Sequence, residues 1–273
     1  MTLLFPILDT RNRNIQGIEK YGETLMYVNS EGIVFRQIKA AGGRRMLLIF
    51  TRKYGKISAG SNLSEKGRSK AALALRPFTY GQYEFFKNRD YYNLNSGETR
   101  KSFFRIGEDL DKYFTASMAL EITEKALGEE FPQPKIFDLL LEFLTALELR
   151  EQKHETLLLA YEIKLLNLLG TAPEVSRCAC CSGKDNLNWF SVKDGGIICD
   201  KCKELKQDKL IFKAEFDIVE VVSFFVKNPM RNFSKIALDE GIARKLQAIV
   251  RDYMAYHLDI SQLKSDGVLE GNF

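Results

Sequence analysis

The five cysteines of the chain all lie between Cys178 and Cys202. Cys178 and Cys181 form one C-x2-C pair, and after seventeen residues Cys199 and Cys202 form a second pair. This spacing is typical of four-cysteine zinc sites. Each C-x2-C turn directs two thiolates at one ion about 2.3 Å away, and two turns complete a tetrahedron. We expect a structural Zn²⁺ site here, because four thiolates leave no open position at which the ion could activate water.

Two details qualify this expectation. Cys180 is a fifth thiol that would replace Cys178 or Cys181 in a misassigned site, but adjacent cysteines bind one ion less well, so we interpret it as a spectator. Ser182-Gly183 and Gly195-Gly196 supply small residues where the chain must turn tightly. The alternative is that the two pairs are unrelated reduced cysteines.

The chain shows no constellation typical of an enzyme. Its two histidines, His154 and His257, have no H-E-x-x-H context and no cysteine nearby in the sequence. There is no phosphate-binding G-x-x-x-x-G-K-[ST] loop and no G-x-S-x-G elbow. Paired acids such as Glu129-Glu130 lie at expected helix ends, where solvation or capping explains them. We therefore expect a protein without catalytic residues.

Charge divides the chain into two parts. Up to Ile106 there are 19 Lys and Arg against 8 Asp and Glu, an excess of 11 positive charges. From Gly107 onward there are 21 against 28, an excess of 7 negative charges. A basic front half indicates a polyanionic partner such as nucleic acid, although a solvated surface without a specific partner has the same composition.

The period of the apolar residues also changes near residue 106. Short runs rich in β-branched and aromatic residues, separated by glycine turns, predict about five strands in a small barrel or sandwich. The expected strands are 26–39, 46–52, 56–61, 73–87 and 91–96, with a loop or short helix at 64–75.

Behind this region the apolar residues recur at helical spacing. The helix formed by Lys135–Leu149 is apolar on most sides, which predicts a central position in a bundle. The expected helices are Asp109–Leu127, Lys135–Leu149, Glu155–Leu169, Ala214–Lys227 and Leu238–Leu258. The fold class is thus α+β and multidomain, with the cysteine module inserted into the helical part.

We expect no membrane segment and a cytoplasmic location. No run approaches the 18 apolar residues of a transmembrane helix. The apolar opening MTLLFPIL precedes Arg11 and Arg13, the reverse of the order in a secretory signal. Cysteines remain reduced in the cytoplasm, which again favours a metal over disulfides.

Several segments together resemble the RecO family of DNA repair proteins, and their order and spacing make the resemblance specific. They run from about Met26 to the last helix near 260. These segments are Glu31–Arg36, Phe50–Ala59, Arg76–Phe78, Ser102–Arg105, Glu108–Leu110, Leu169–Pro173 and the cysteine module with Phe190 and Gly195-Gly196.

The resemblance implies an N-terminal OB-fold barrel at 26–106 and a helical domain at 107–273, with the zinc module at about 174–204. It implies a mediator of recombinational repair that binds single- and double-stranded DNA and anneals complementary strands. It also implies RecR and the single-stranded DNA-binding protein as partners, assistance to RecA loading, and nucleoid association.

An OB-fold binds a strand through a basic groove and aromatic faces on which bases stack. The candidate phosphate contacts are Arg36, Lys39, Arg44, Arg45, Arg52, Lys53, Lys56, Lys66, Arg68 and Lys70. The candidate aromatic residues, of which we expect about half to form the barrel core, are Phe35, Tyr54, Tyr80, Tyr83, Phe85, Tyr91 and Tyr92.

The segment after the third strand departs from the family's strongly basic pattern. Lys66, Arg68, Ser69 and Lys70 keep that pattern. Asn62, Leu63 and Glu65 do not keep it. Residues 44 and 45, both arginine, are expected to compensate.

Two further expectations concern the ends of the chain. Residues 1–25 precede the usual family start near Met26: either translation starts there, or these residues form an N-terminal extension. The acidic helical half is expected to bind protein partners. Arg244, Lys245 and Arg251 are candidates for the rim of a hydrophobic pocket for the tail of the single-stranded DNA-binding protein, although a solvated face explains them equally.

The main alternative is an interaction scaffold whose OB-fold binds protein, with a structural zinc and no direct contact to DNA. Glu65 favours this alternative, whereas the basic front half favours DNA. An RNA-binding module is a third reading, because OB-folds also bind RNA.

Overall fold

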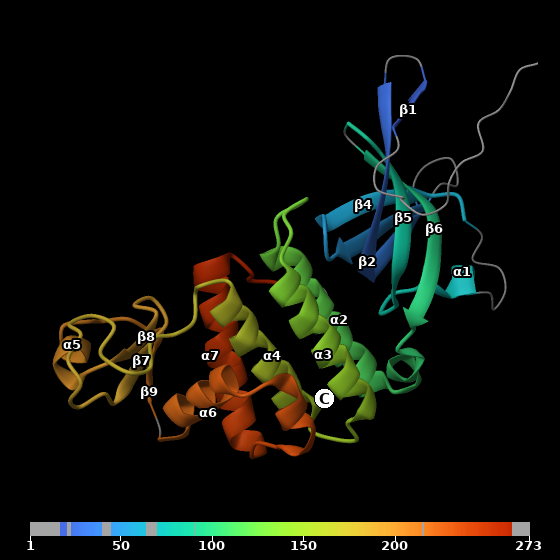
Figure 1. The fold of residues 1–273 in the computed structure, drawn as a ribbon. Helices are drawn as coiled ribbons and strands as arrows, with labels where there is room; N and C mark the ends of the chain where they lie inside the picture. The colour runs from blue at the N-terminus through green and yellow to red at the C-terminus, as the bar shows by residue number, and fades with distance from the viewer. Residues whose placement is uncertain are drawn as a thin grey trace, which may run out of the picture. The chain divides into compact units, whose positions relative to one another are not determined.

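The computed structural model describes residues 17–20, 23–39, 45–63, 70–89, 91–214 and 216–263. The chain forms two compact units. The first comprises the residues up to Thr51 together with Ile57–Ser102, and the second comprises Arg52–Lys56 together with Phe103 onward. Figure 1 shows strands in the first unit and mainly helices in the second.

The first unit is a closed barrel. Its elements among the described residues are β1 (Gly17–Lys20), β2 (Glu23–Lys39), β3 (Arg45–Thr51), β4 (Gly55–Ser61), α1 (Lys70–Leu73), β5 (Tyr80–Asn88) and β6 (Tyr91–Lys101). The strand order is β1-β2-β3-β4-β6-β5, and β5 pairs back onto β2. The pair β4–β6 is parallel, whereas β2–β3, β2–β5 and β5–β6 are antiparallel. This five-stranded closure, with a helix between the third and fourth barrel strands, confirms the predicted OB-fold.

Strand β2 takes part in both halves of the closure. Its Met26–Ile33 stretch pairs with β5 and its Gly32–Lys39 stretch pairs with β3. Glycine is required where the two pairings meet, because a Cβ on Gly32 would lie 2.8 Å from Cγ2 of Ile49 and 3.0 Å from the Tyr83 ring. The barrel strand begins at Glu23, and β1 precedes it as an antiparallel partner within the segment expected to be an extension.

The barrel interior is aromatic. Tyr83, Phe85 and Phe50 are completely buried. The Tyr83 hydroxyl donates to the carbonyl oxygen of Ala74 at 2.7 Å, which satisfies its polar atom. Burial raises the pKa of Tyr83. Each such side chain contributes about 1.5–3 kcal/mol by leaving water.

The predicted strand at 73–87 is wrong in its first half, because β5 begins only at Tyr80. The amide of Arg76 donates to Leu73 O and the amide of Thr79 donates to Arg76 O, which makes residues 73–79 a turn. Pro77 has no amide hydrogen for a strand ladder, and Phe78 has a positive φ of 63°.

The second unit is a helical bundle with an inserted module. Its elements among the described residues are η2 (Phe104–Glu108), α2 (Leu110–Ala126), α3 (Pro134–Leu149), α4 (His154–Leu168), β7 (Trp189–Ser191), β8 (Gly196–Ile198), α5 (Asp200–Glu204), β9 (Ile211–Lys213), α6 (Phe216–Lys227), η3 (Met230–Lys235) and α7 (Glu240–Leu258). The five predicted helices are all present, with ends that differ by at most two residues.

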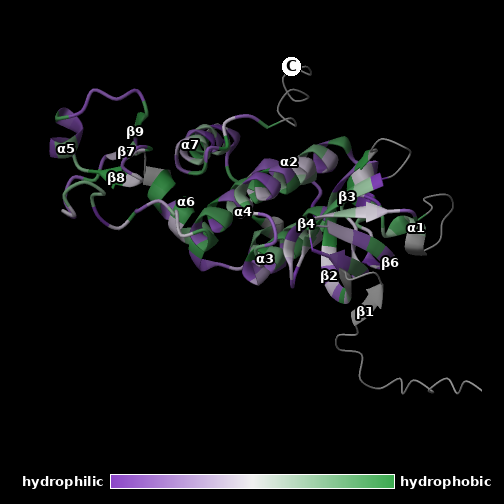
Figure 2. Cartoon of the chain, turned by 90° about the horizontal axis from the view of Figure 1, so that it is seen from above, coloured by the Kyte–Doolittle hydropathy of each residue, from purple (hydrophilic) through white to green (hydrophobic). Residues whose placement is uncertain are grey.

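Helix α4 is the centre of this bundle, since it contacts α2, α3, α6 and α7. Its residues from Thr156 to Ile163 are all buried, including Glu162, whose carboxylate accepts a hydrogen bond from Gln247 Nε2 at 2.8 Å. Helix α3, which the sequence placed in the centre, packs beside it. In Figure 2 the outer helices carry both hydrophobic and hydrophilic residues.

A buried arginine holds the chain after α3. Arg150 donates from Nε to Lys153 O at 3.0 Å, from Nη1 to Phe233 O at 2.6 Å and from Nη2 to Ile236 O at 2.7 Å. The guanidinium therefore joins the α3–α4 loop to the C-terminal half of η3 and the residue that follows it. Burial lowers the pKa of Arg150.

Candidate metal centre and nucleic-acid interface

The two C-x2-C turns bring four sulfur atoms together. The Sγ atoms of Cys178, Cys181, Cys199 and Cys202 lie within 4.8 Å of one another. The first turn closes through the amide of Ser182, which donates to Cys178 O at 2.8 Å. The second turn is the start of α5, where the amide of Lys203 donates to Cys199 O at 3.0 Å.

The sulfur spacing fits a tetrahedral ion. Four ligands at about 2.3 Å from one centre are separated by about 3.8 Å along each edge. The Sγ atoms of Cys181 and Cys199 are 3.8 Å apart. A disulfide would need about 2.05 Å. The four cysteines are thus a possible metal site.

The electrostatics of the cluster also favour a cation. Burial by itself raises the pKa of Cys178, but backbone amides of Cys181, Cys199 and Cys180 outweigh it and lower the pKa to about 6. Hydrogen bonding to Cys199 raises the pKa of Cys202. The thiolate form is thus favoured at Cys178 and disfavoured at Cys202, and a bound dication would favour it at both.

The scaffold of the cluster was missed by sequence reasoning. Within the described part of the chain, β7, β8 and β9 form a three-stranded sheet in the order β8-β7-β9. Each strand has only three residues, too few for a detectable period of two. Ile198 is buried against Cys178 and Cys199, and Trp189 packs on this group.

The predicted small residues act at two turns. At the first cysteine turn Ser182 has a positive φ of 61°, and the amide of Cys178 donates to Gly183 O at 2.7 Å; the other two small residues lie at the β7–β8 turn. Gly195 has a φ of +77°, and a Cβ on Gly196 would overlap the backbone of Glu174. Cys180 is exposed and lies outside the four-sulfur group. Burial and a hydrogen bond to Asp194 raise its pKa.

The basic candidates of the front half have different surroundings. Arg36 on β2 and Lys53 in the β3–β4 turn are exposed, whereas Arg45 at the start of β3 is half-buried. Five candidates have side chains outside the described residues, of which two have a described backbone: Lys39 in β2 and Lys70 in α1. The three without a described backbone are Arg44, Lys66 and Arg68.

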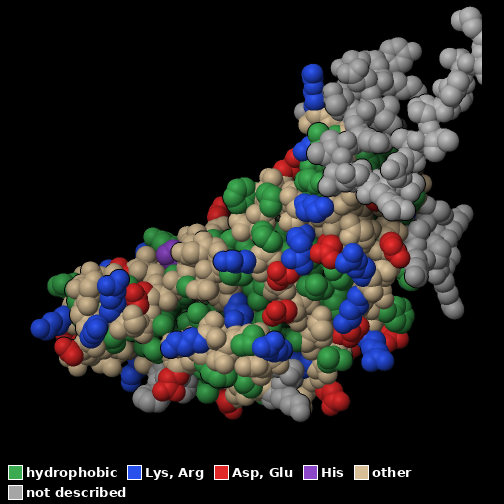
Figure 3. Space-filling model, viewed as in Figure 1, with side chains coloured by type: hydrophobic (Ala, Val, Ile, Leu, Met, Phe, Trp, Pro, Cys, Tyr) green, Lys and Arg blue, Asp and Glu red, His purple; other side chains and the backbone are tan. Residues whose placement is uncertain are grey.

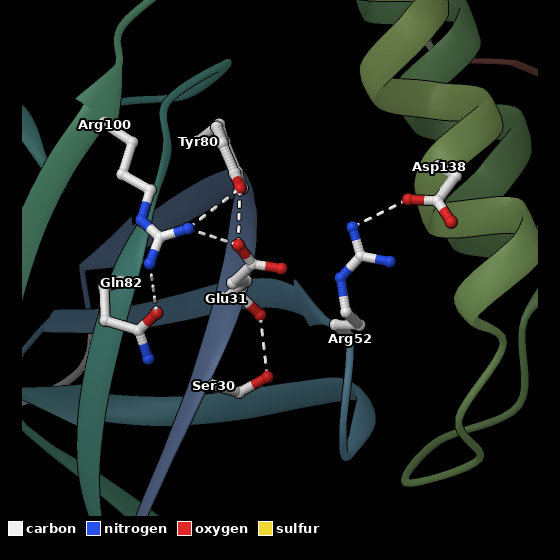
Figure 4. A network of polar contacts seen from close by, with 7 residues as sticks. All are labelled: Ser30, Glu31, Arg52, Tyr80, Gln82, Arg100 and Asp138. Atoms are coloured by element: carbon white, nitrogen blue, oxygen red, sulfur yellow. Dashed lines mark hydrogen bonds and ion pairs between the residues drawn. The ribbon is translucent and has the colours of Figure 1, made fainter.

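Two of the basic candidates are engaged inside the second unit. Arg52 Nη2 lies 2.7 Å from Asp138 Oδ1, as Figure 4 shows, and its guanidinium carbon lies 4.5 Å above the Phe137 ring. Lys56 Nζ donates to Glu124 O at 2.7 Å. A phosphate would have to compete with these contacts.

The seven aromatic candidates divide as expected. The buried ones are Phe35, Tyr83, Phe85 and Tyr92. Tyr54 and Tyr80 are half-buried, and Tyr91 is exposed. Sequence reasoning did not select the basic residues of the last two barrel strands and their turn, which are Lys87, Arg89, Arg100 and Lys101.

The second unit contains an apolar pocket of about 320 Å³ between β9, α6 and α7. Ile218, Leu246 and Ile249 are buried in its wall. Two exposed lysines, Lys213 and Lys245, line the opening. Lys245 is one of the predicted rim residues, and Lys213 was missed. Arg244 and Arg251 do not line the pocket, and Arg244 pairs with Glu240.

Comparison with known proteins identifies the family. The family model of the recombination protein O N-terminal domain matches residues 26–103, and that of its C-terminal domain matches residues 107–267. The chain belongs to the RecO family.

Curated RecO proteins match most of the chain. A protein named DNA repair protein RecO from Alkaliphilus metalliredigens is 29% identical over 235 residues, 86% of this chain and 95% of its own length. The RecO protein of Caldanaerobacter subterraneus subsp. tengcongensis is 27% identical over 242 residues, 89% of this chain and 97% of its own length. That of Bacillus pumilus is 31% identical over 177 residues, 65% of this chain and 69% of its own length.

The RecO assignment agrees with the two-unit fold, since the first model covers the OB barrel and the second covers the helical unit with the cysteine cluster. No helix among the described residues is long and apolar enough to cross a membrane. On the face drawn in Figure 3, Lys and Arg side chains lie over both units with Asp and Glu between them.

Proposed function

We propose that this RecO protein binds single- and double-stranded DNA, anneals complementary strands, and assists RecA loading together with RecR. The observation that carries the proposal is a closed OB barrel in the half of the chain with an excess of 11 positive charges. OB barrels bind strands through such basic surfaces. The protein acts by binding and not by catalysis, in the cytoplasm at the nucleoid.

Annealing follows from charge neutralisation. Two complementary strands repel each other through their phosphates, and Lys and Arg on the barrel reduce that repulsion. Base pairing then selects the correct partner strand, so the protein itself needs no sequence specificity. Displacing counterions from the phosphates makes such binding weaken steeply as salt rises.

The ten candidate residues contribute unequally to the proposed DNA surface. Arg36 and Lys53 are exposed and suit phosphate contacts. Arg52 and Lys56 contribute less, because their cationic groups already contact Asp138 and Glu124. The remaining phosphate contacts of the proposal are Lys39, Arg44, Arg45, Lys66, Arg68 and Lys70.

The decisive experiment mixes two complementary labelled oligonucleotides with the purified protein at low and at moderate salt. Rapid annealing that fades as salt rises is the expected result. Absence of both annealing and binding at low salt would overturn the proposal. The alternative, a scaffold whose barrel binds protein, would then take its place.

The metal of the cysteine cluster is proposed to be Zn²⁺ with a structural role. Cys178, Cys181, Cys199 and Cys202 would hold it, and the 3.8 Å sulfur spacing supports this choice. The ion would supply a crosslink between the turn at 178–181 and the start of α5. Total-metal analysis of protein purified without added zinc tests the proposal, with one Zn²⁺ per chain expected.

The apolar pocket in the helical unit supports a protein partner. An apolar tail with negative charge, as proposed for the single-stranded DNA-binding protein, would place its apolar end against Ile218 and Ile249 and its charge near Lys213 and Lys245. The double variant Lys213→Glu/Lys245→Glu should lose retention on immobilised single-stranded DNA-binding protein. The control Arg244→Glu alters an exposed residue of the same helix outside the pocket, and equal loss in this control would contradict the assignment.

A further inference from the structure

One part of the outer barrel surface is acidic and closed by its own contacts. Glu31, Glu84 and Glu98 lie on β2, β5 and β6. Arg100 is bonded to Glu31 and donates to Gln82 Oε1 at 3.1 Å, as Figure 4 shows. Ser96 donates to Glu84 at 2.6 Å, and Tyr80 donates to Glu31 at 2.6 Å. This surface is a poor site for a phosphate, because Arg100 is already bonded to Glu31 and Gln82 and the carboxylates repel the negative charge of the phosphate.

A second part, here named the β4–β6 strip, has a different character. Strands β4 and β6 run parallel, with Ala59 opposite Tyr92 and Gly60 opposite Asn93. Exposed positions alternate with buried ones on both strands, so the exposed side chains point outward. Within the described ranges 58–62 and 91–95, which define the strip, the outward residues include no carboxylate; they are Ser58, Gly60, Asn62, Tyr91, Asn93 and Asn95.

The strip is flat at its middle and aromatic at one end. A Cβ on Gly60 would lie 3.1 Å from Asn93 Oδ1, so glycine keeps the surface level there. The Tyr91 side chain is 52% exposed. Its hydroxyl accepts a hydrogen bond from Asn88 Nδ2 at 3.2 Å, which restrains the ring from the neighbouring strand.

A basic residue, Arg89, lies two residues before Tyr91 in the turn that leads into β6. Arg89 follows Asn88 in the β5–β6 turn and is exposed, and its amide is bonded to Asn88 Oδ1 at 2.6 Å. Asp90, the other turn residue, lies outside the described residues. This turn joins the fourth and fifth barrel strands, and the corresponding loop is one of two loops with which OB-folds bind oligonucleotides.

The neighbouring strand β3 cannot share this role with its own side chains. Leu47, Leu48, Ile49 and Phe50 are buried in succession, so both faces of β3 are covered. OB-folds commonly bind on their second and third strands, which are β3 and β4 here. With β3 covered, the accessible outward surface next to β4 is that of β6.

We propose that the β4–β6 strip is the path of single-stranded DNA across the barrel, with a base stacked on Tyr91 and a phosphate at Arg89. The inference rests on the proposed DNA-binding function and gives it a location. The amide and hydroxyl side chains of the strip can both donate and accept hydrogen bonds, so they can bond to the polar edge of any base. Stacking is equally tolerant of sequence, as an annealing protein requires.

The test compares two ligands of equal length, an oligothymidine and the same sugar-phosphate chain without bases. The wild type should prefer the oligothymidine, and Tyr91→Ala should weaken oligothymidine binding roughly tenfold while leaving the abasic strand nearly unchanged. Tyr91→Phe keeps the ring and should bind as the wild type does. Tyr256→Ala is the matched control, because Tyr256 on α7 is 53% exposed, close to the value for Tyr91.

Arg89→Ala supplies the second arm. This variant should bind both ligands more weakly than the wild type, by a similar factor. It should also lower the slope of log affinity against log salt by about 0.7, the value of one phosphate contact on a single strand. If the wild type binds neither ligand, the proposed function has failed. If the wild type binds oligothymidine and Tyr91→Ala binds it equally well, the function stands and the β4–β6 strip is not the path.

Discussion

The barrel and the cysteine module use their functional residues in opposite ways. The barrel buries apolar and aromatic side chains such as Tyr83 and Phe85, and its candidate DNA contacts lie outside on the same strands. The module has few apolar residues to bury, and Cys178 and Cys199 themselves are part of its interior. A surface site can therefore be removed without loss of the fold, whereas the module's site and its fold are inseparable.

The largest predicted effect comes from the module. Cys199→Ser removes a buried ligand, and since a structural zinc contributes on the order of 10–16 kcal/mol to small domains, the module should lose both its metal and its structure. Metal analysis and limited proteolysis around residues 174–213 would measure the two losses.

Cys180→Ser is the control for that variant, because Cys180 lies outside the four-sulfur group. It should retain metal and resist proteolysis like the wild type. Metal loss in this variant would show that the ligand set has been misassigned. The comparison between the surface site of the barrel and the interior site of the module would then no longer hold.

The second prediction makes the same substitution in the core of the barrel and in the core of the helical bundle. Phe85 in the barrel and Phe143 in the helical bundle are both completely buried. Replacing either with Ala should reduce the free energy of unfolding by about 3–5 kcal/mol, because each leaves a cavity. Urea denaturation measures the loss. DNA binding should fall for Phe85→Ala at urea concentrations that leave Phe143→Ala able to bind.

The third prediction concerns the basic segment between β4 and β5. Replacing Lys66, Arg68 and Lys70 with Ala should weaken DNA binding and lower the salt slope by about 2, if each cation contacts one phosphate of a single strand. The free energy of unfolding should stay within about 0.5 kcal/mol of the wild-type value. Titration of labelled oligonucleotide at several salt concentrations gives the slope.

Its matched control removes three exposed cations from the acidic half, Lys135, Lys184 and Lys227. Removal of charge as such would affect both triple variants alike, whereas phosphate contacts would affect only the first. An unchanged salt slope in the first variant would remove this segment from the DNA surface.

The smallest predicted effect is a pH dependence in the helical unit. Burial raises the pKa of Tyr253 from 10.0 to about 12. A raised folded-state pKa stabilises the protein fully below the unfolded value, and this contribution is lost as pH rises from 10 through 12. Tyr253→Phe should remove at most about 1.4 kcal/mol per pH unit from the pH slope of stability. Urea midpoints of both proteins at pH 9 and pH 11 test this, and identical slopes would contradict it.

The sequence by itself determined the elements that depend on local spacing. The spacing of the two C-x2-C pairs predicted a shared centre, and long helices such as Lys135–Leu149 show their apolar period over several turns. The order of strand-rich and helix-rich segments likewise predicted both units. The family resemblance added the OB-fold, which strand spacing alone left open between barrel and sandwich.

Only the tertiary structure decided which polar and aromatic residues are accessible. Tyr91 and Tyr92 are adjacent and chemically identical, yet one is exposed and the other is in the core, because a strand alternates its faces and only the barrel defines the inside. The sequence predicts Arg52 as a phosphate contact, and only the fold pairs it with Asp138, 86 residues away. Such contacts between distant residues depend on the closed fold, and the spacing of residues in the sequence does not predict them.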